Sequence, residues 1–363
     1  MGERENGMFY AWRRYWARGL DLFIYGLLWA VLTVLVFHIN IADSGIDVRI
    51  MNTVMQLALM VLMEPLLLHF FGTTPGKAIL GIRVVREDGG MLTVAQGFSR
   101  TIGVLIKGMG LSIPIYSLYT NYKSYGRCSD QRIQPWDEGI SYTIKDTKRY
   151  RWLVYVAANA AVFGSLVVVA MSGQLPPNRG KLTVAEFAEN YNYLAGYYNV
   201  ASATQSLGAD GKWQDETVPG EYHIAFSDME TPEFIYEVKN GYITGISFLV
   251  EERNRDEALP LFDTEAMLAV LAFTGAQKGA GIFNNDRGTI VDWIGASYFR
   301  DYHIVYRGVD ITCERESKGY RKPISWLLIP EQDAENLYYR TEFRMRLDDK
   351  AQGVKSPVCV YGD

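Results

Sequence analysis

The chain has 363 residues, and its 36 Lys and Arg residues against 41 Asp and Glu residues leave a net charge of −5 at pH 7. This length exceeds that of one typical domain, so two domains are expected. The slight negative charge and the lack of a basic stripe with interleaved aromatic residues give no reason to expect nucleic-acid binding. The three cysteines have none of the close spacings of a zinc site or a redox pair, and no metal or cofactor is expected.

Three apolar runs in the first half predict membrane-spanning helices, at residues 20–39, 50–71 and 152–171. Each is close to the ~20 residues that cross the hydrocarbon core. The arginine-rich N-terminus lacks the cleavage site of a signal peptide, so the first span is expected to remain as an anchor. The positive-inside rule places this N-terminus in the cytoplasm of a multi-pass cell-membrane protein, and the third span carries the chain outward.

Residues 101–120 form a further apolar segment with basic residues on both sides, and Gly108, Gly110 and Pro114 interrupt it. A single crossing would put the basic stretch that follows on the wrong side. We therefore predict a re-entrant hairpin or an interfacial helix pair, which a membrane tolerates when the broken backbone is buried in protein or faces water.

Two short segments next to this one favour extended structure on the cytoplasmic face. Residues 82–94, IRVVREDGGMLTV, predict a small β-hairpin around Asp88-Gly89-Gly90. Residues 140–144, ISYTI, predict another strand. If these strands pair with each other, both loops lie on the same side of the membrane.

Residues 151–180 are assigned to the last span and a linker rich in Pro and Gly, and residues 181–363 to a soluble extracytoplasmic α+β domain with an antiparallel sheet. A helix is predicted at residues 184–203, with a capping box of Thr183 and Glu186. Asn240-Gly241 predicts a hairpin turn within residues 234–251. The remaining expected elements are a helix at 264–277 and strands at 289–294, 302–314, 325–329 and 338–347. Because a helix followed by strands occurs twice, a duplicated unit is one interpretation.

Cys313 and Cys359 both fall in this outer domain. An oxidising compartment would allow a disulfide between them. The alternative is two buried free thiols, since spacing does not reveal connectivity.

Charged residues also occur within the predicted spans. Arg14, Arg18 and Asp21 share one helix stripe, so one of the arginines is the expected partner of Asp21. A lone carboxylate at the bilayer centre costs ~2.5–3.5 kcal/mol and usually pairs. Glu64 precedes Pro65, which would free a backbone carbonyl beside the carboxylate. That pair predicts either a cation or proton site, or a carboxylate paired with a basic residue of the inner loop.

The spacing Arg14-x-x-Ala17-x-x-x-Asp21 resembles the signature of the RDD family. Residues 73–85, which contain Thr74-Pro75-Gly76-Lys77, are similar to the motif that leads into a β-hairpin in that family. Arg100 and the sequence Gln134-Pro135-Trp136-Asp137-Glu138 before the strand ISYTI complete the resemblance, which covers residues 10–148. Many members have His where this chain has Trp136, so a proton relay through that position does not carry over.

The resemblance implies one function and the domain organisation favours another. Some RDD members are implicated in exchange of sodium or lithium for protons, in which Asp21, Glu64 and Asp137 would alternate between protonated and cation-bound states and Arg14 would set their pKa values. A unit with three spans would then need to form a homo-oligomer. Because half of the chain is the outer domain, we favour a membrane anchor that presents this domain to a protein or envelope ligand. We expect no enzyme, since no nucleophile or acid–base pair stands out.

Overall fold

The computed structural model describes residues 10–38, 46–146, 148–198, 205–215, 229–283, 287–297, 299–324, 327–332, 334, 336–348 and 358–361. The chain divides at residue 170 into two compact units, apart from residues 38–40, which belong to the second. Each unit has its own hydrophobic core.

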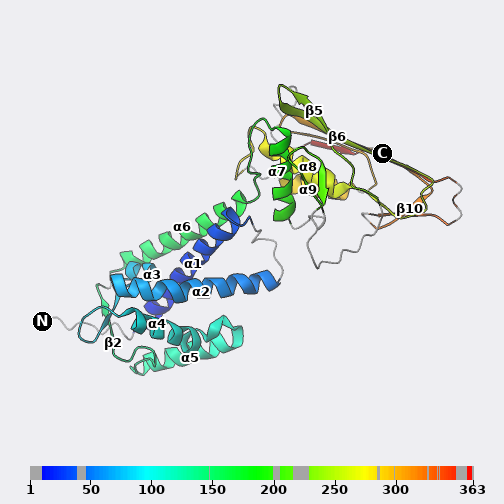
Figure 1. The fold of residues 1–363 in the computed structure, drawn as a ribbon. Helices are drawn as coiled ribbons and strands as arrows, with labels where there is room; N and C mark the ends of the chain where they lie inside the picture. The colour runs from blue at the N-terminus through cyan, green and yellow to red at the C-terminus, as the bar shows by residue number, and fades with distance from the viewer. Residues whose placement is uncertain are drawn as a thin grey trace. The chain divides into compact units, whose positions relative to one another are not determined.

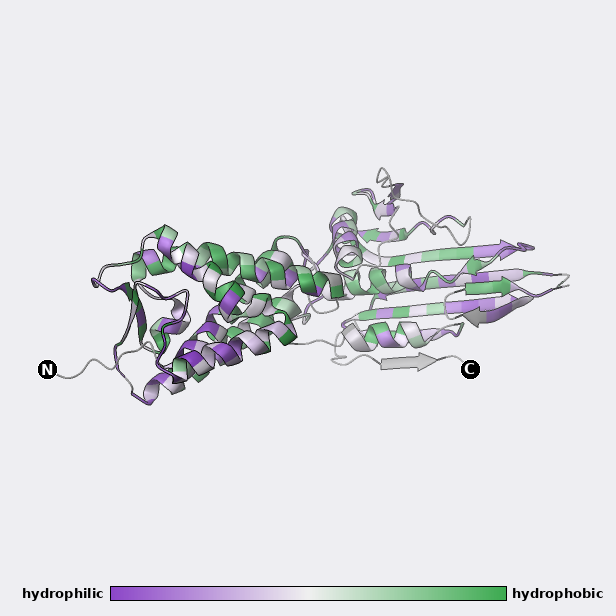
Figure 2. Cartoon of the chain, turned by 90° about the horizontal axis from the view of Figure 1, so that it is seen from below, coloured by the Kyte–Doolittle hydropathy of each residue, from purple (hydrophilic) through white to green (hydrophobic). Residues whose placement is uncertain are grey.

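Three helices of the first unit are long and apolar enough to cross a membrane: α1 (Ala11–Leu35), α2 (Ile46–Phe71) and α6 (Tyr150–Ser172). Hydrophobic residues extend along them in Figure 2. At ~1.5 Å per residue, each exceeds the ~30 Å thickness of the hydrocarbon core. The three predicted spans are therefore confirmed as helices. Because α1 begins nine residues before the predicted apolar run, Arg14 and Arg18 lie within the helix.

The apolar segment at residues 101–120 is not one continuous helix (Figure 1). α4 (Val94–Gly103) continues as a π-helical turn, η2 (Val104–Gly108), and a 3₁₀ turn, η3 (Gly110–Ser112), precedes α5 (Pro114–Ser129). Residues 110–112 all have positive φ angles. The chain therefore breaks where glycine and proline were expected to interrupt it, and the insertion of the segment into a bilayer stays a prediction.

The predicted hairpin within residues 82–94 is wrong, but its first strand exists. β1 (Ile82–Arg86) pairs antiparallel with β2 (Ile140–Ile144), with Val84 opposite Tyr142. After the turn at Asp88, the chain enters α4 rather than a second strand. Thr93 and Gln96 form a capping box there, which satisfies backbone N–H groups at the start of α4 and so favours a helix. The pairing of residues 82–86 with residues 140–144, which was considered in the sequence analysis, is thus confirmed.

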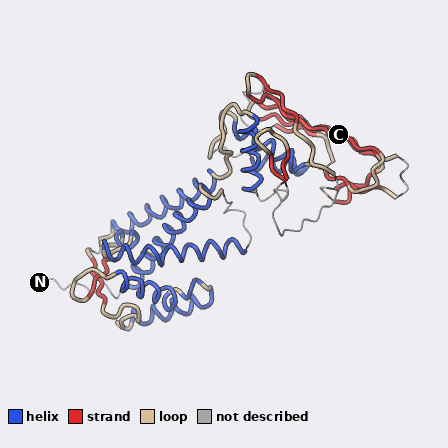
Figure 3. The backbone as a smooth tube through the Cα atoms, viewed as in Figure 1, coloured by secondary structure: helices blue, strands red, loops and turns tan. Residues whose placement is uncertain are grey.

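The second unit is an α+β domain built on a six-stranded antiparallel sheet in the order β13-β8-β9-β12-β6-β5. Its strands are β5 (Ile235–Lys239), β6 (Tyr242–Arg253), β8 (Tyr302–Tyr306), β9 (Val309–Lys318), β12 (Tyr338–Leu347) and β13 (Val358–Tyr361). The helices α7 (Val184–Tyr197), α8 (Asp263–Ala276) and α9 (Arg287–Ala296) gather on one side of it (Figure 3). β3 (Gln205–Leu207) and β4 (Trp213–Asp215) form a small ladder, and β7 (Leu259–Pro260), β10 (Tyr320–Ile324) and β11 (Leu327–Pro330) form a three-stranded sheet.

The local signals of this domain are mostly confirmed. The capping box of Thr183 and Glu186 begins α7, whose C-cap is Tyr198, and residues 199–203 of the predicted helix lie outside the described part. Asn240 and Gly241 both have positive φ angles in the β5–β6 turn. The run at residues 302–314 folds as the β8–β9 hairpin. β11 begins at residue 327, after residues 325–326, which are not described.

One other expectation is corrected. Residues 289–294 form part of α9 instead of a strand, because the buried Ile290 and Ile294 lie four residues apart on one helix face. The strands that follow both helical regions join one sheet, with β12 between β9 and β6, and the duplication of a helix-plus-strands unit stays a prediction.

Of the two alternatives for Cys313 and Cys359, the disulfide is not the one observed, because Cys313 is a buried free cysteine. Cys313 lies on β9 opposite Tyr302, while Cys359 lies on β13 opposite Ile304. β8 therefore separates them, and two strand spacings amount to ~9.5 Å. A disulfide needs Cα atoms within about 7 Å.

Candidate functional site

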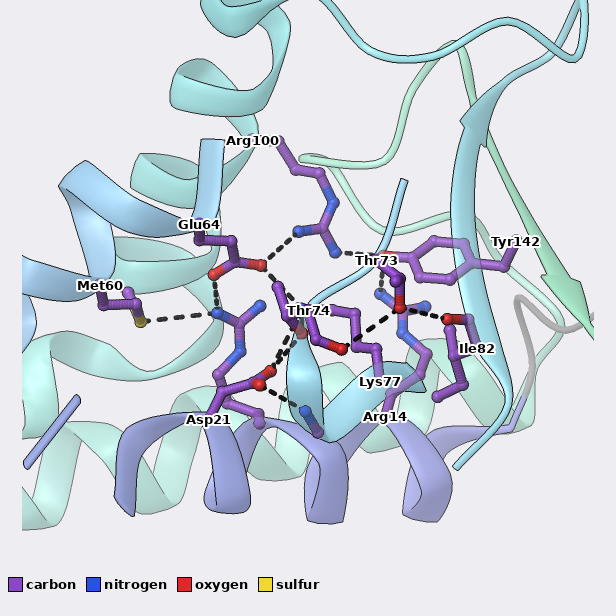
Figure 4. Close-up of polar contacts among 12 residues, drawn as sticks. Arg14, Asp21, Met60, Glu64, Thr73, Thr74, Lys77, Ile82, Arg100 and Tyr142 are labelled. Carbon is purple, nitrogen blue, oxygen red and sulfur yellow. Dashed lines mark hydrogen bonds and ion pairs between the residues drawn. The ribbon is translucent and has the colours of Figure 1, made fainter. Parts of the chain in front are cut away.

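A buried ionic cluster lies where α1, α2, α3 (Pro75–Ile79), α4 and the segment before β2 meet (Figure 4). Its carboxylates are almost completely buried, and four basic side chains surround them. The acidic members are Asp21, Glu64 and Asp137, and the basic members are Arg14, Arg18, Lys77 and Arg100. The structure thus brings together the four charged residues predicted from the sequence and the basic residue of the Thr74–Lys77 motif.

Asp21 is held by the turn that opens α3. The Thr74 hydroxyl donates to its Oδ2 at 2.5 Å, and the Gly76 N–H donates to its Oδ1 at 2.7 Å. Lys77 Nζ lies 3.6 Å away. The expected pairing with Arg14 or Arg18 is therefore wrong. The short Asp21 side chain takes the donors of the adjacent turn, whereas the arginines reach other carboxylates.

Glu64 is the centre of the cluster. It forms an ion pair with Arg18, accepts a hydrogen bond from Lys77 Nζ at 2.8 Å, and accepts another from Arg100 Nη1 at 3.1 Å. Of the two interpretations of Glu64, pairing with basic residues of the following loop is the one observed. Pro65 packs against Gly97 of α4, where an added Cβ would lie 3.0 Å from the Pro65 Cα.

Asp137 joins α1 to the strand β2. It pairs with Arg14, and Arg100 Nε and the Tyr142 hydroxyl donate to its Oδ1 at 3.2 and 2.8 Å. The Arg14 guanidinium also lies 4.2 Å from the centre of the Tyr142 ring, a cation–π contact. Tyr142 was not among the site residues predicted from the sequence. Its hydroxyl, at the middle of a short buried strand, was a signal because buried tyrosines usually find a polar partner.

The carboxylate oxygens of the cluster all have partners, and its basic groups outnumber its acidic groups. Each of the six carboxylate oxygens has a donor or cationic partner, and four basic groups face three acidic ones, which leaves one net positive charge. Burial lowers the pKa of Lys77, and the nearby Glu64 opposes that shift. A cation entering this cluster would therefore have to displace existing partners.

A cavity of about 500 Å³ adjoins the cluster, and the carboxylates do not line it. The cluster residues on its wall are Arg14, Arg18, Lys77, Arg100 and Tyr142. Within the described ranges, no three His, Cys, Asp or Glu residues are arranged to hold a metal ion. The chemistry available at this surface is thus that of hydrogen-bond donors and positive charge.

Comparison with known proteins identifies the first unit. Residues 10–174 match the family described as the RDD family. No curated protein and no solved structure matches the chain. The family match ends before the α+β domain.

Proposed function

Because residues 10–174 belong to the RDD family, we propose that this membrane unit anchors the C-terminal α+β domain and presents it on the extracytoplasmic side of the cell membrane, where the domain binds a protein or envelope partner. The basic residues at the start of α1 and around β2 support this orientation through the positive-inside rule. The anchor itself is the set of apolar helices α1, α2 and α6.

The main support for this proposal is that every carboxylate oxygen of Asp21, Glu64 and Asp137 already has a donor or cationic partner. A cation exchanger needs a carboxylate that can exchange its partner for a cation or a proton. Here each carboxylate is held by groups from other segments of the chain. Removing one partner of a buried ion pair costs about 3–5 kcal/mol, and the net positive charge of the cluster repels a cation. The cluster therefore acts as a brace that fixes α1, α2 and α4, and a sodium or lithium exchange function is not favoured.

The sheet of the outer domain supplies a surface for a partner. Its residues alternate between a buried face, which holds Phe248 and Phe343, and an exposed face. On the exposed face, Arg340 lies opposite Glu251 of β6 and Glu316 of β9. The alternation of hydrophilic and hydrophobic residues along these strands is visible in Figure 2. Such a charged surface is suited to a polar partner rather than to lipid.

Two single-cysteine variants test the orientation. In a background without native cysteines, Lys239→Cys and Asp88→Cys place thiols at exposed positions of the outer domain and of the turn after β1. A reagent that does not cross membranes should label Lys239→Cys in intact cells and Asp88→Cys only after lysis. Labelling in the reverse order would refute the proposed presentation.

A flux measurement tests the anchor role against transport. The full chain is reconstituted in liposomes that contain a pH-sensitive dye, and sodium or lithium is added outside. We expect no lumenal pH change beyond that of protein-free liposomes. A cation-dependent change that Asp21→Asn abolishes would show that the cluster transports ions and would overturn the anchor interpretation.

A further inference from the structure

The charged side chains that line the cavity beside the ionic cluster are all basic. Four basic side chains line it, with exposed fractions of 16% for Arg14, 12% for Arg18, 4% for Lys77 and 2% for Arg100. The acidic partners are at most 1% exposed and do not contribute to the wall. The carboxylates therefore lie behind the basic groups, and any molecule in the cavity meets positive charge first.

Hydrogen-bond donors remain on this wall after the cluster has formed. A guanidinium has five N–H donors, but Arg18 makes its contacts with Glu64 and Met60 through Nη1 alone. Its Nε and Nη2 have no partner in the described part of the protein. Trp136 also lines the cavity, and its indole nitrogen, which is itself buried, has no acceptor among the described residues. Indole N–H groups that are buried usually find one.

Most of the other residues on the wall are apolar or aromatic, and Asn121, Ser124 and Gln134 are its uncharged polar members. Val104 and Met109 line it from the region after α4, and Leu118, Tyr122 and Tyr125 line it from α5. The cavity lies within the ~300–1,000 Å³ range of small-molecule sites. One water takes up only ~30 Å³, so an inorganic ion would leave most of the space unfilled. The shape and chemistry of this wall suit a molecule with an apolar part and a charged end.

We propose that this cavity binds an amphiphile through its oxyanion head, a phosphate or a carboxylate. The head would accept hydrogen bonds from Arg18 and neutralise the excess charge of the cluster, since guanidinium groups match such oxyanions in a bidentate geometry. The apolar part would pack along α5. This site is independent of the outer domain and of the partner proposed for it.

Native mass spectrometry of the full chain tests the proposal with defined probes. The protein is released from micelles that contain phosphatidylglycerol and phosphatidylcholine in equal amounts, so that an anionic and a zwitterionic lipid compete. We expect saturable retention of phosphatidylglycerol. A second experiment measures the thermal unfolding of the protein with inorganic phosphate and with phosphatidylglycerol. It distinguishes binding of a free anion from binding of a lipid head group.

Two kinds of variant locate the binding. Arg18→Gln should weaken phosphatidylglycerol binding about tenfold or more, because a charge-assisted hydrogen bond is lost. Since this variant also alters the Glu64 pairing, a second pair leaves the cluster intact. Ser124 lines the cavity from α5. Ser124→Glu adds a carboxylate to the wall, and Ser124→Gln adds the same volume without charge. Binding should be lost in Ser124→Glu and remain in Ser124→Gln.

The outcomes divide clearly. Selective binding of phosphatidylglycerol that falls in Arg18→Gln and is far weaker in Ser124→Glu than in Ser124→Gln would establish the site. Equal retention of both lipids, or equal binding by the two Ser124 variants, would overturn it. If inorganic phosphate stabilised the protein as much as phosphatidylglycerol does, the proposal of an amphiphile would also be overturned, because the apolar wall would then contribute nothing to binding.

Discussion

At the scale of single residues, Gly76 shows why the motif before β1 has its composition. Its N–H donates to Asp21, and a Cβ at this position would lie 2.1 Å from the Ala17 carbonyl oxygen of α1. No side chain fits at that distance. The absence of a Cβ thus lets the start of α3 approach α1 closely enough to satisfy a buried carboxylate.

We expect Gly76→Ala to destabilise the membrane unit by at least 1–3 kcal/mol, because overpacking at a backbone contact forces the two helices apart. Thermal unfolding of the purified full chain in detergent measures the effect. Gly126→Ala is the matched control, since nothing lies within 4 Å of a Cβ at Gly126 and alanine favours the α5 helix by about 0.5–1 kcal/mol. Equal melting temperatures in the two variants would contradict the close approach.

A second residue predicts a pH dependence in the α+β domain. Burial raises the pKa of Glu265, in the first turn of α8, from 4.5 to about 7, and the charge of Asp263 adds to the shift. The folded state therefore binds a proton more tightly than the unfolded state. The stability that protonated Glu265 contributes is fully present below pH 4.5 and is lost as the pH rises to about 7.

Glu265→Gln should consequently raise the stability of the α+β domain at pH 8, by up to about 3 kcal/mol, and change it little at pH 4.5. Thermal unfolding at the two pH values, followed by circular dichroism, provides the comparison. A variant that is less stable than the wild-type protein at pH 8 would show that ionised Glu265 is stabilised in the fold.

At the scale of elements, β12 organises the α+β domain. It pairs with β9 from Tyr338 to Leu347 and with β6 from Tyr338 to Arg346, and its residues 339, 341, 343 and 345 are buried. Phe343 stacks against Phe248 of β6 with ring centroids 5.1 Å apart. The strand thus joins the two halves of the sheet through both its backbone and its side chains.

Phe343→Ala should cost about 3–5 kcal/mol, because the fully buried ring leaves a cavity in the core. The neighbouring Arg344 points to the opposite face and is 66% exposed, so Arg344→Ala should change stability by no more than about 0.5 kcal/mol. Chemical denaturation of both variants checks the assignment of the faces. A larger effect for Arg344→Ala would mean that the strand register is shifted by one residue.

At the scale of the whole molecule, the chain is two units with separate cores. The core of the membrane unit packs α1, α2 and α3 against β1, with Leu20, Leu68 and Ile82 among its members. The core of the α+β domain packs α7, α8 and α9 on the large sheet. Because the two cores share no buried residue in the described part of the chain, we expect the two units to unfold separately.

We therefore expect two thermal transitions in the full chain, and each variant should move only one of them. Gly76→Ala should lower the transition temperature of the membrane unit, and Phe343→Ala should lower that of the α+β domain. Differential scanning calorimetry in detergent resolves the two. A single transition that both variants lower to the same extent would show that the units fold as one cooperative body.

The sequence by itself determined the features that depend on neighbouring residues. Apolar length predicted the three long helices, the capping box predicted the start of α7, and Asn240-Gly241 predicted the turn between β5 and β6. The family motifs pointed to Arg14, Asp21 and Asp137, which the structure places in one ionic cluster.

Only the tertiary structure decided which groups meet. Arg14 pairs with Asp137, 123 residues away, and β1 pairs with β2 instead of with the residues after its own turn. Spacing along a helix could not reveal these partners, since long basic side chains reach across to other segments. The distinction between strand and helix at α9 also depended on packing against the sheet. The basic wall of the cavity arises in the same way, because it exists only where α1, α3 and α4 converge.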